Sequence, residues 1–369
     1  MKLIVFAAFL FSISARAQNT GSAAQIDSLL RSVYKDEYPG ASIIIYQDGK
    51  TVFQKSYGVA SMQSGQPLTD SSNFNICSLT KQFTALAILQ LEENRKLSLD
   101  DHISRFFPGM NKKLADVVTV KELLTHSSGI IDHYDYTNTT GMEHAHNKDV
   151  FEAIKNIDST YFTPGAKFRY SNTAYCLLAL IIEKISGISY NAYMKENVFE
   201  PAGMKHTIIW NEDAVIKNEV TGYEWDSTTH VFKQSGAAEH IFFSTEGDGG
   251  VYTSINDYMH WFKTLQSGKV FSKNIVGKAR NLQFTINKEK RSGYGFGWFI
   301  DEKAATVKVY HSGSNGGFRT YSFTIPSKNY AVVIFSNRDD IDLEMLVRKI
   351  ILLQWPSVKQ FTNIEELTS

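Results

Sequence analysis

Hydrophobic positions recur with two different spacings along the chain, and the change of spacing divides it into three parts. Near the N-terminus, residues 24–34 repeat apolar side chains at intervals that place them on one helix face. Residues 42–46 and 51–57 are rich in β-branched and aromatic side chains and flank Asp48-Gly49, a dipeptide typical of a tight hairpin turn. The pattern therefore predicts a helix followed by a β-hairpin.

Longer apolar stretches with helical spacing fill the middle of the chain. The stretch at 174–185 is the most apolar and ends at Gly187, and Ser254 is suited to cap the helix after it. The last third returns to short β-rich runs separated by turn residues. The expected helices cover 79–92, 120–124, 174–185, 254–265 and 342–353, and the expected strands cover 295–300, 306–310, 320–325 and 331–335.

Strands at both ends and helices between them predict an α+β fold. The simplest arrangement is one antiparallel sheet built from both termini, flanked by the terminal helices, with a helical lobe inserted. We expect one domain over 18–355, in which the sheet lobe takes about 23–60 and 291–355 and the helical lobe about 61–290, and then a tail over 356–369. A cleft between two such lobes is a natural place for a small-molecule site.

The first seventeen residues, 1–17, have the pattern of a signal peptide. Lys2 precedes an almost unbroken apolar run over 3–13, and Ala15-Arg16-Ala17 places two small residues where cleavage requires them. The apolar run is too short for a stable transmembrane helix. The alternative to a cleaved signal peptide is an uncleaved membrane anchor. No later segment is long and apolar enough to span a membrane. The pattern predicts a periplasmic or secreted protein without stable membrane insertion after cleavage.

Charge and cysteine content limit the possible partners. The 369 residues include 38 basic and 38 acidic side chains, and loss of Lys2 and Arg16 with the leader leaves two fewer basic than acidic residues. Because there is no basic excess to neutralise phosphates, we expect no nucleic-acid partner. An export route permits a disulfide, but Cys77 and Cys176 lie in apolar surroundings, and two buried free thiols are favoured.

A serine three residues before a lysine occurs twice. On a helix the two side chains lie on one face, where a lysine amine can take the proton of the serine hydroxyl and so activate it as a nucleophile. Ser32 and Lys35 lie on the N-terminal amphipathic helix and fit an exposed face. Ser78 and Lys81 lie where an extended segment turns into an apolar helix, a rigid setting. The context favours Ser78 as the nucleophile over a plain helix cap.

Tyr170-Ser171-Asn172 adds a second set of polar side chains. A tyrosine hydroxyl can shuttle a proton, and an asparagine two residues later can hold a substrate amide or orient a lysine. The run precedes the apolar stretch at 174–185, whereas a similar run at 136–138 lies in polar surroundings. We expect Tyr170 to act in proton transfer and Asn172 in substrate binding, the alternative for Tyr170 being a core aromatic.

His311-Ser312-Gly313 follows a predicted strand. Glycine lets a substrate approach a strand edge closely, and the backbone N–H groups of Ser314 and Ser78 can together form an oxyanion hole. The pattern assigns His311, Gly313 and Ser314 to substrate binding. The alternative for His311 is a structural hydrogen bond at the end of the strand.

In this order, Ser-x-x-Lys, Tyr-x-Asn and His-x-Gly resemble the serine β-lactamase-related family, which includes class C β-lactamases, D,D-peptidases and related esterases. The resemblance implies a β-lactamase/transpeptidase-like fold and a covalent mechanism without metal or cofactor. In that mechanism Ser78 attacks a carbonyl, Lys81 and Tyr170 handle its proton, and water resolves the acyl-enzyme. Further similar stretches cover 123–129, 164–172, 249–254, 294–298 and 311–318, and the resemblance runs from about 36 to 337.

His311 departs from class C β-lactamases, which usually have lysine at this position. A neutral histidine binds a substrate carboxylate less strongly, so a D-Ala-type peptidase or an esterase, acting on a small-molecule or peptide substrate, is favoured over a potent β-lactamase. Arg319 can supply the missing cation or form a structural ion pair. The rival from another class is a catalytically silent module that binds penicillin or cell-wall peptides, which needs no proton relay.

The remaining candidate residues lie between 126 and 161. His126 is expected to hold a loop through hydrogen bonds. His144 and His146 suggest a metal site, but no third ligand has convincing spacing and a solvated loop is favoured. The segment is instead expected to wall the substrate cleft, with candidate contacts from Tyr134, Tyr136 and Tyr161.

Overall fold

The computed structural model describes residues 22–136, 144–235, 241–302 and 306–355. The predicted signal peptide and the predicted tail lie outside these ranges. A helix covers residues 22–33, close to the predicted 24–34. Among the described residues no single helix is long and apolar enough to cross a membrane. One pair of helices, Asn172–Ser186 and Tyr190–Ala202, has the required length and composition when taken together, but the pair is bent by 80° at its junction.

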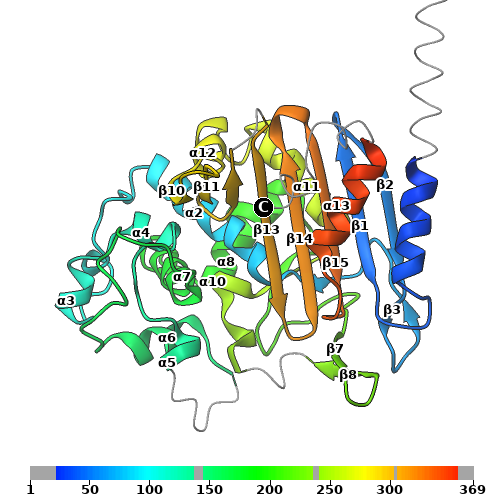
Figure 1. Ribbon diagram of the computed structural model, residues 1–369. Coiled ribbons are helices and arrows are strands. Elements are labelled where there is room, and N and C mark those ends of the chain that lie inside the picture. The colour runs from blue at the N-terminus through cyan, green and yellow to red at the C-terminus, as the bar shows by residue number, and fades with distance from the viewer. Residues whose placement is uncertain (1–21, 137–143, 236–240, 303–305, 356–369) are drawn as a thin grey trace, which may run out of the picture.

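Both ends of the chain supply strands to one eight-stranded antiparallel sheet, which confirms the predicted α+β architecture (Figure 1). The first strand lies between the last strand and its own hairpin partner, with Ala41 opposite both Ser336 and Tyr57. Asp48 and Gly49 turn the hairpin with positive φ angles, as a type I′ turn requires. In spatial order the strands are β10 (Phe284–Asn287), β11 (Ser292–Tyr294), β12 (Phe299–Asp301), β13 (Lys308–Asn315), β14 (Phe318–Ile325), β15 (Tyr330–Ser336), β1 (Ala41–Gln47) and β2 (Lys50–Tyr57).

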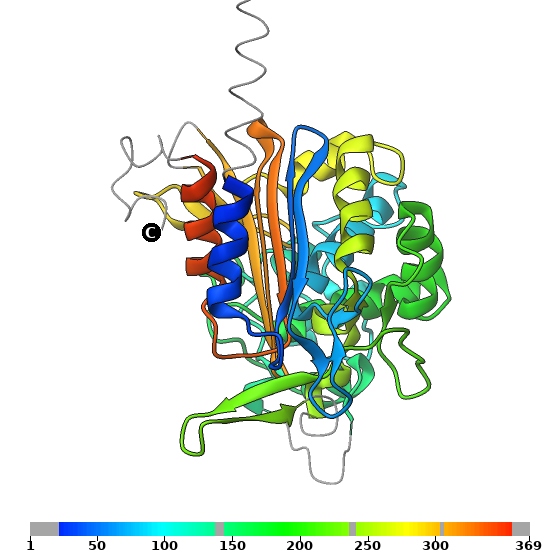
Figure 2. The ribbon, with the colours of Figure 1, turned by 90° about the vertical axis from the view of Figure 1, so that its right-hand side faces the viewer.

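Helices cover both faces of this sheet. The helix at 22–33 and α13 (Leu343–Gln354) lie side by side on one face, as Figure 2 shows. On β1, Ile43 and Ile45 join the core beneath these two helices, whereas Ile44 joins the core shared with the helical lobe. Because successive strand residues point to opposite faces, one apolar run serves both cores.

The inserted lobe is built around two buried helices, α2 (Thr80–Glu93) and α7 (Asn172–Ser186). Ser171 caps α7 by accepting the Ala174 N–H, and Gly187 ends it in the left-handed conformation. The other helices are α3 (Lys112–Ala115), α4 (Val120–Leu124), α5 (His133–Tyr136), α6 (Asn147–Ile154), α8 (Tyr190–Met194), α9 (Glu200–Ala202), α10 (Glu246–Gly249), α11 (Ile255–Ser267) and α12 (Lys273–Ala279). Short strands are β3 (Val59–Ser61), β4 (Gln66–Pro67), β5 (Phe74–Asn75), β6 (Ile208–Ile209), β7 (Gly222–Asp226), β8 (Val231–Ser235) and β9 (Val251–Thr253).

Two predicted strands differ from the observed ones. Residues 295–300 do not form a single strand, because the chain turns at 295–298 between β11 and β12. Gly297 lies in this turn with φ 85°, and a Cβ there would approach the Lys81 carbonyl oxygen to 2.8 Å. The turn is apolar because it packs on α2. β13 continues to Asn315, beyond the predicted end at 310.

The C-terminal half of β13, residues 311–315, has one open edge. β12 pairs only with residues 308–310, whereas residues 311–315 pair with β14 alone within the described part of the chain. Ser312 and Ser314 are exposed along this half, while His311 and Gly313 are buried. An open strand edge presents unpaired peptide groups that can accept an extended ligand.

Candidate active site

Ser78 lies in a tight single turn, η1 (Cys77–Leu79), between β5 and α2. Cys77 has φ 51°, a strained left-handed conformation for a residue with a side chain. Its N–H donates to Asn75 Oδ1 at 2.7 Å, and the preceding Ile76 N–H donates to the Val251 carbonyl at 2.9 Å. The turn is therefore held from both sides, and the half-buried Ser78 has a fixed position.

Lys81 lies one turn further along and is fully buried. Its Nζ is 3.0 Å from Ser78 Oγ, 2.8 Å from Asn172 Oδ1 and 2.9 Å from the Asp248 carbonyl oxygen. As an ammonium it donates to all three oxygens. As a neutral amine it can donate to Asn172 and Asp248 while its lone pair accepts the Ser78 proton. The structure thus brings the predicted Ser78, Lys81 and Asn172 together.

Aromatic rings surround the lysine. Lys81 Nζ lies 4.8 Å from the centre of the Tyr170 ring and 5.6 Å from that of Tyr175. The Tyr170 hydroxyl is buried and has no hydrogen-bond partner within the described part of the chain. Among the described residues Lys81 alone hydrogen-bonds to the Ser78 hydroxyl, while Tyr170 lines the cavity and presents its ring to the lysine.

His126 holds the loop before Tyr170, as predicted. Its Nδ1 accepts a hydrogen bond from the Ser171 N–H at 3.1 Å, and the centres of the His126 and Tyr170 rings are 4.2 Å apart. Burial, and after it the nearby Lys81 charge, hold the pKa of His126 well below its ordinary value. A neutral His126 can accept this hydrogen bond, and it thereby fixes the position of Tyr170.

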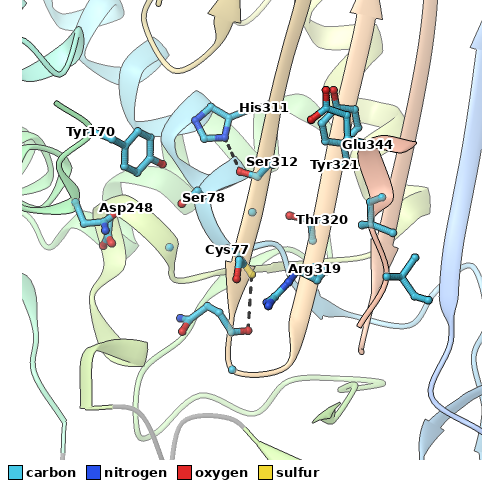
Figure 3. A pocket seen from close by; sticks show the side chains of 18 of the residues that line it. Cys77, Ser78, Tyr170, Asp248, His311, Ser312, Arg319, Thr320, Tyr321 and Glu344 are labelled. Carbon is cyan, nitrogen blue, oxygen red and sulfur yellow. Dashed lines mark hydrogen bonds between the residues drawn. The ribbon is translucent and has the colours of Figure 1, made fainter. Parts of the chain in front are cut away.

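Gly313 lies directly against the nucleophile turn. A Cβ there would lie 2.3 Å from Thr320 Oγ1 and 2.8 Å from both Cys77 Cβ and the Ile76 carbonyl oxygen. The Thr320 hydroxyl in turn donates to that carbonyl at 2.9 Å. Only glycine lets β13 approach this closely, so β13 lies against the Ser78 turn (Figure 3), and Ser78 and Ser314 line the same cavity. The oxyanion hole from the two N–H groups stays a prediction.

His311 lines the cavity but has both ring nitrogens engaged inside the protein. Nδ1 donates to the Ser312 carbonyl at 2.6 Å, and Nε2 accepts from the Tyr294 hydroxyl at 3.0 Å. Burial, and after it the charge of Lys81, lower the pKa of His311 to about 3. His311 is therefore neutral at pH 7 and supplies no fixed cation to the cavity.

The sequence suggests that Arg319 either supplies a cation to the substrate site or forms a structural ion pair, and its position allows both. It lines the cavity, and its Nη2 lies 3.9 Å from Asp339 Oδ2 while Nη1 donates to the Phe318 carbonyl. At 3.9 Å the ion pair is loose. Arg319 therefore has a structural partner and still faces the space around β13.

The cavity has a volume of about 810 Å³, large enough for a peptide-sized ligand. It extends from Ser78 around the open edge of β13 to the start of α13. Its wall includes all the predicted site residues except the buried Lys81. The lining comprises Cys77, Ser78, Tyr134, Tyr170, Asn172, Glu224, Asp248, Gly249, Phe299, residues 311–316, residues 319–321 and residues 341–344.

Asp248 is the site residue that sequence reasoning missed. It belongs to α10, which packs so closely on α7 that a Cβ at Gly247 would meet the Tyr175 carbonyl oxygen at 2.3 Å. This contact brings the Asp248 carbonyl oxygen to Lys81. The available signal was its place directly before Gly249-Gly250, because an acidic residue at such a close-packed turn has a specific environment.

Other candidates lie away from Ser78. His146 lies between Glu246 Oε1 at 2.9 Å and Glu212 Oε1 at 2.8 Å, and these hydrogen bonds, the Glu246 bond first, raise the pKa of His146 to about 9. Among the described residues no group of three or more His, Cys, Asp or Glu side chains forms a metal site. Tyr161 donates to Asp135 outside the cavity, whereas Tyr134 lines it.

Three further predictions concern the decoy motifs and the cysteines. Ser32 is exposed and donates to the Leu29 carbonyl, and the exposed Lys35 reaches a different oxygen, so the first Ser-x-x-Lys forms no pair. Both cysteines are buried free thiols, as expected. The tyrosine decoy at 136–138 lies largely outside the described residues.

Several known proteins are similar to this chain over most of its length. A family model described as Beta-lactamase matches residues 26–353. Protein flp of Staphylococcus aureus (strain MW2) is 31% identical over 323 residues, which cover 86% of this chain and 63% of that protein. Penicillin-binding protein 4* of Bacillus subtilis (strain 168) is 30% identical over 328 residues, which cover 85% of this chain and 72% of that protein.

A solved structure is also similar over nearly the full length. The octameric penicillin-binding protein homologue from Pyrococcus abyssi superposes with a TM-score of 0.75 at 27% identity, covering 99% of this chain and 79% of that chain. The chain spans less than two thirds of the length of Protein flp. By sequence match, fold and site geometry together, the chain belongs to the beta-lactamase family of serine hydrolases and penicillin-binding proteins.

Proposed function

We propose that this protein is an exported serine hydrolase that forms an acyl-enzyme on Ser78 and acts on amide, peptide, ester or β-lactam carbonyls. The contact of 3.0 Å between Lys81 Nζ and Ser78 Oγ carries the proposal. Because Asn172 and the Asp248 carbonyl accept the other N–H groups, the lone pair of a neutral Lys81 points at the hydroxyl. An amine held in this way can take the proton as the serine attacks.

The proposed reaction has two halves. Ser78 Oγ adds to the substrate carbonyl carbon while its proton passes to Lys81, and the N–H groups of Ser78 and Ser314 stabilise the oxyanion. The first tetrahedral intermediate then collapses: the bond from the carbonyl carbon to the leaving group breaks, and the leaving group takes the proton from Lys81, with Tyr170 as the proposed relay. Water adds to the resulting Ser78 ester and gives a proton to Lys81. Collapse of this second intermediate breaks the ester bond, frees the acid and returns the proton to Ser78 Oγ.

The charge of the site supports a preference among substrates. A neutral His311 gives no fixed cation for a substrate carboxylate, and Arg319 is shared with Asp339. These observations favour a D-Ala-type peptidase or an esterase over a potent β-lactamase, with small-molecule or peptide substrates. The sequence of residues 1–17 supports export to the periplasm or beyond.

Intact-protein mass spectrometry with a fluorophosphonate tests the proposal. One adduct is expected per chain, on the peptide that contains Ser78, because Lys81 activates that hydroxyl alone. Turnover is expected with p-nitrophenyl acetate or D-alanyl peptides, and nitrocefin is expected to acylate Ser78 with slow release. Absence of any adduct would exclude a reactive Ser78, and adducts without turnover of any substrate would indicate a binding module.

Gly313→Ala is expected to lower kcat/KM by about 100-fold, because the new methyl group must push β13 away from the Ser78 turn and a shift near 1 Å costs about that much. Overpacking of this kind is expected to cost about 1–3 kcal/mol of unfolding free energy. The measurement is steady-state kinetics with a thermal melt. Gly277→Ala is the matched control, since a Cβ there meets nothing within 4 Å. Equal kinetics of the two variants would contradict the close packing.

A further inference from the structure

We propose that the Asp248 carboxylate is a subsite for the ammonium group of the substrate. The inference rests on the proposed function and narrows its substrate class. It assigns to Ser78 amides, esters and peptides of amino acids whose amino group is unblocked.

The first observation is the charge of the cavity wall. Among the described lining residues there are four carboxylates and one guanidinium, that of Arg319. His311 is neutral, and Arg319 already lies near Asp339. Such a wall attracts a cationic ligand and repels an anionic one. The four carboxylates belong to Glu224, Asp248, Asp342 and Glu344.

Three of these carboxylates have protein partners. Glu224 accepts from the Ser235 hydroxyl at 2.9 Å, Asp342 caps α13 by accepting the Met345 N–H at 2.9 Å, and Glu344 pairs with Arg348. Their hydrogen bonds explain their presence without any ligand. Asp248 differs from them in both burial and partners.

Asp248 is only 4% exposed, yet its carboxylate has a single weak donor. The Cys176 thiol lies 3.4 Å from Oδ1, and no other donor reaches the carboxylate within the described part of the chain. Lys81 contacts the Asp248 carbonyl oxygen, not the carboxylate. A thiol is a weak donor that compensates little of the cost of burying a carboxylate, so this side chain is placed to receive a cation.

The position of Asp248 fits an ammonium next to the attacked carbonyl. Lys81 Nζ contacts both Ser78 Oγ and the Asp248 backbone, so the two residues lie on either side of one amine. In the view of Figure 3, Asp248 and Tyr170 are on one side of the pocket and the strand that carries Ser312 is on the other. In an amino-acid amide the α-amino nitrogen is two bonds from the carbonyl carbon, which suits a site this near the nucleophile.

Tyr134 adds a second feature typical of ammonium sites. It lines the same cavity as Asp248 and is 52% exposed. A cation between a carboxylate and an aromatic face gains both Coulomb and cation–π stabilisation. A blocked amine, such as an N-acetyl group, brings no charge and adds bulk against this wall.

Asp248→Asn is expected to lower kcat/KM for D- or L-alanine p-nitroanilide, whichever is the better substrate, by about 10- to 100-fold, the size of a lost charge-assisted hydrogen bond. The N-acetyl analogue is expected to change by less than about threefold. Asparagine keeps the shape of the side chain and an acceptor for the Cys176 thiol. Asp116→Asn, which makes the same change on an exposed side chain outside the cavity, is the matched control and is expected to leave both rates unchanged.

Binding measured by calorimetry in a Ser78→Ala background separates the inference from the proposed function. Alaninamide is expected to bind at least about tenfold more tightly than N-acetylalaninamide, and Asp248→Asn is expected to remove this difference. Persistence of the preference after Asp248→Asn, or an equal loss of kcat/KM for both p-nitroanilides, would overturn the inference. Preferential binding without Ser78-dependent turnover would refute the hydrolase proposal and leave the subsite standing. The rate of Ser78 labelling by fluorophosphonate reports whether Asp248→Asn is folded.

Discussion

Ser78→Ala is expected to reduce turnover of any true substrate by at least about 10⁴-fold, because alanine lacks the oxygen that forms the acyl-enzyme. Lys81 keeps its contacts with Asn172 and the Asp248 carbonyl in this variant, and the turn is held by Asn75 and Val251. The loss is therefore expected without unfolding. Steady-state rates and a thermal melt measure both effects.

The chain offers a matched control for this variant. Ser32 is the serine of the other Ser-x-x-Lys run, and it is exposed on the N-terminal helix, far along the chain from the cavity. Ser32→Ala is expected to retain the full rate and the fluorophosphonate adduct. Equal residual rates in Ser78→Ala and the wild type would exclude the acyl-enzyme mechanism.

Lys81→Met is expected to slow acylation of Ser78 by about 10³-fold or more, since the hydroxyl loses the only amine within hydrogen-bond reach in the described structure. Methionine also leaves Asn172 Oδ1 and the Asp248 carbonyl oxygen without their donor, at a cost of about 1–3 kcal/mol for each buried acceptor. Single-turnover labelling with fluorophosphonate, together with chemical denaturation, measures the two effects separately.

Lys35→Met is the control for this second variant, because Lys35 is exposed and its Nζ donates to the Arg31 carbonyl, a backbone oxygen of its own helix region. It is expected to leave the labelling rate unchanged and to change the unfolding free energy by no more than about 0.5 kcal/mol. A labelling rate in Lys81→Met within tenfold of the wild type would assign the base to another group. Tyr170 would then be the first candidate, because it lines the same cavity and its hydroxyl has no hydrogen-bond partner within the described residues.

Much of the fold follows from local patterns in the sequence. The hairpin at Asp48-Gly49 and the caps at Ser254 and Gly187 lie where turn and capping chemistry place them. Residues 295–298 were wrongly predicted as strand because they are buried and apolar. These residues are buried because they form a turn that packs on α2. Hydrophobicity alone does not distinguish a buried turn from a buried strand.

The site was predictable where side chains carry the chemistry. Ser78, Lys81 and Asn172 meet as their spacing and context predicted. Asp248 escaped prediction because its contact with Lys81 is made by a backbone oxygen, which every residue has. The neutrality of His311 depends on burial and on Tyr294, and neither is visible in the His-x-Gly motif.

The order of strands in the large sheet has a consequence for how the chain is made. β1 is synthesised early, yet the strand beside it, β15, spans Tyr330–Ser336 and leaves the ribosome nearly last. Pairings so distant in sequence form slowly, because a long loop must close first. Until then the apolar β1 exposes an unpaired edge. A product truncated before β15 is therefore expected to aggregate, even though it contains every residue of the Ser78 turn.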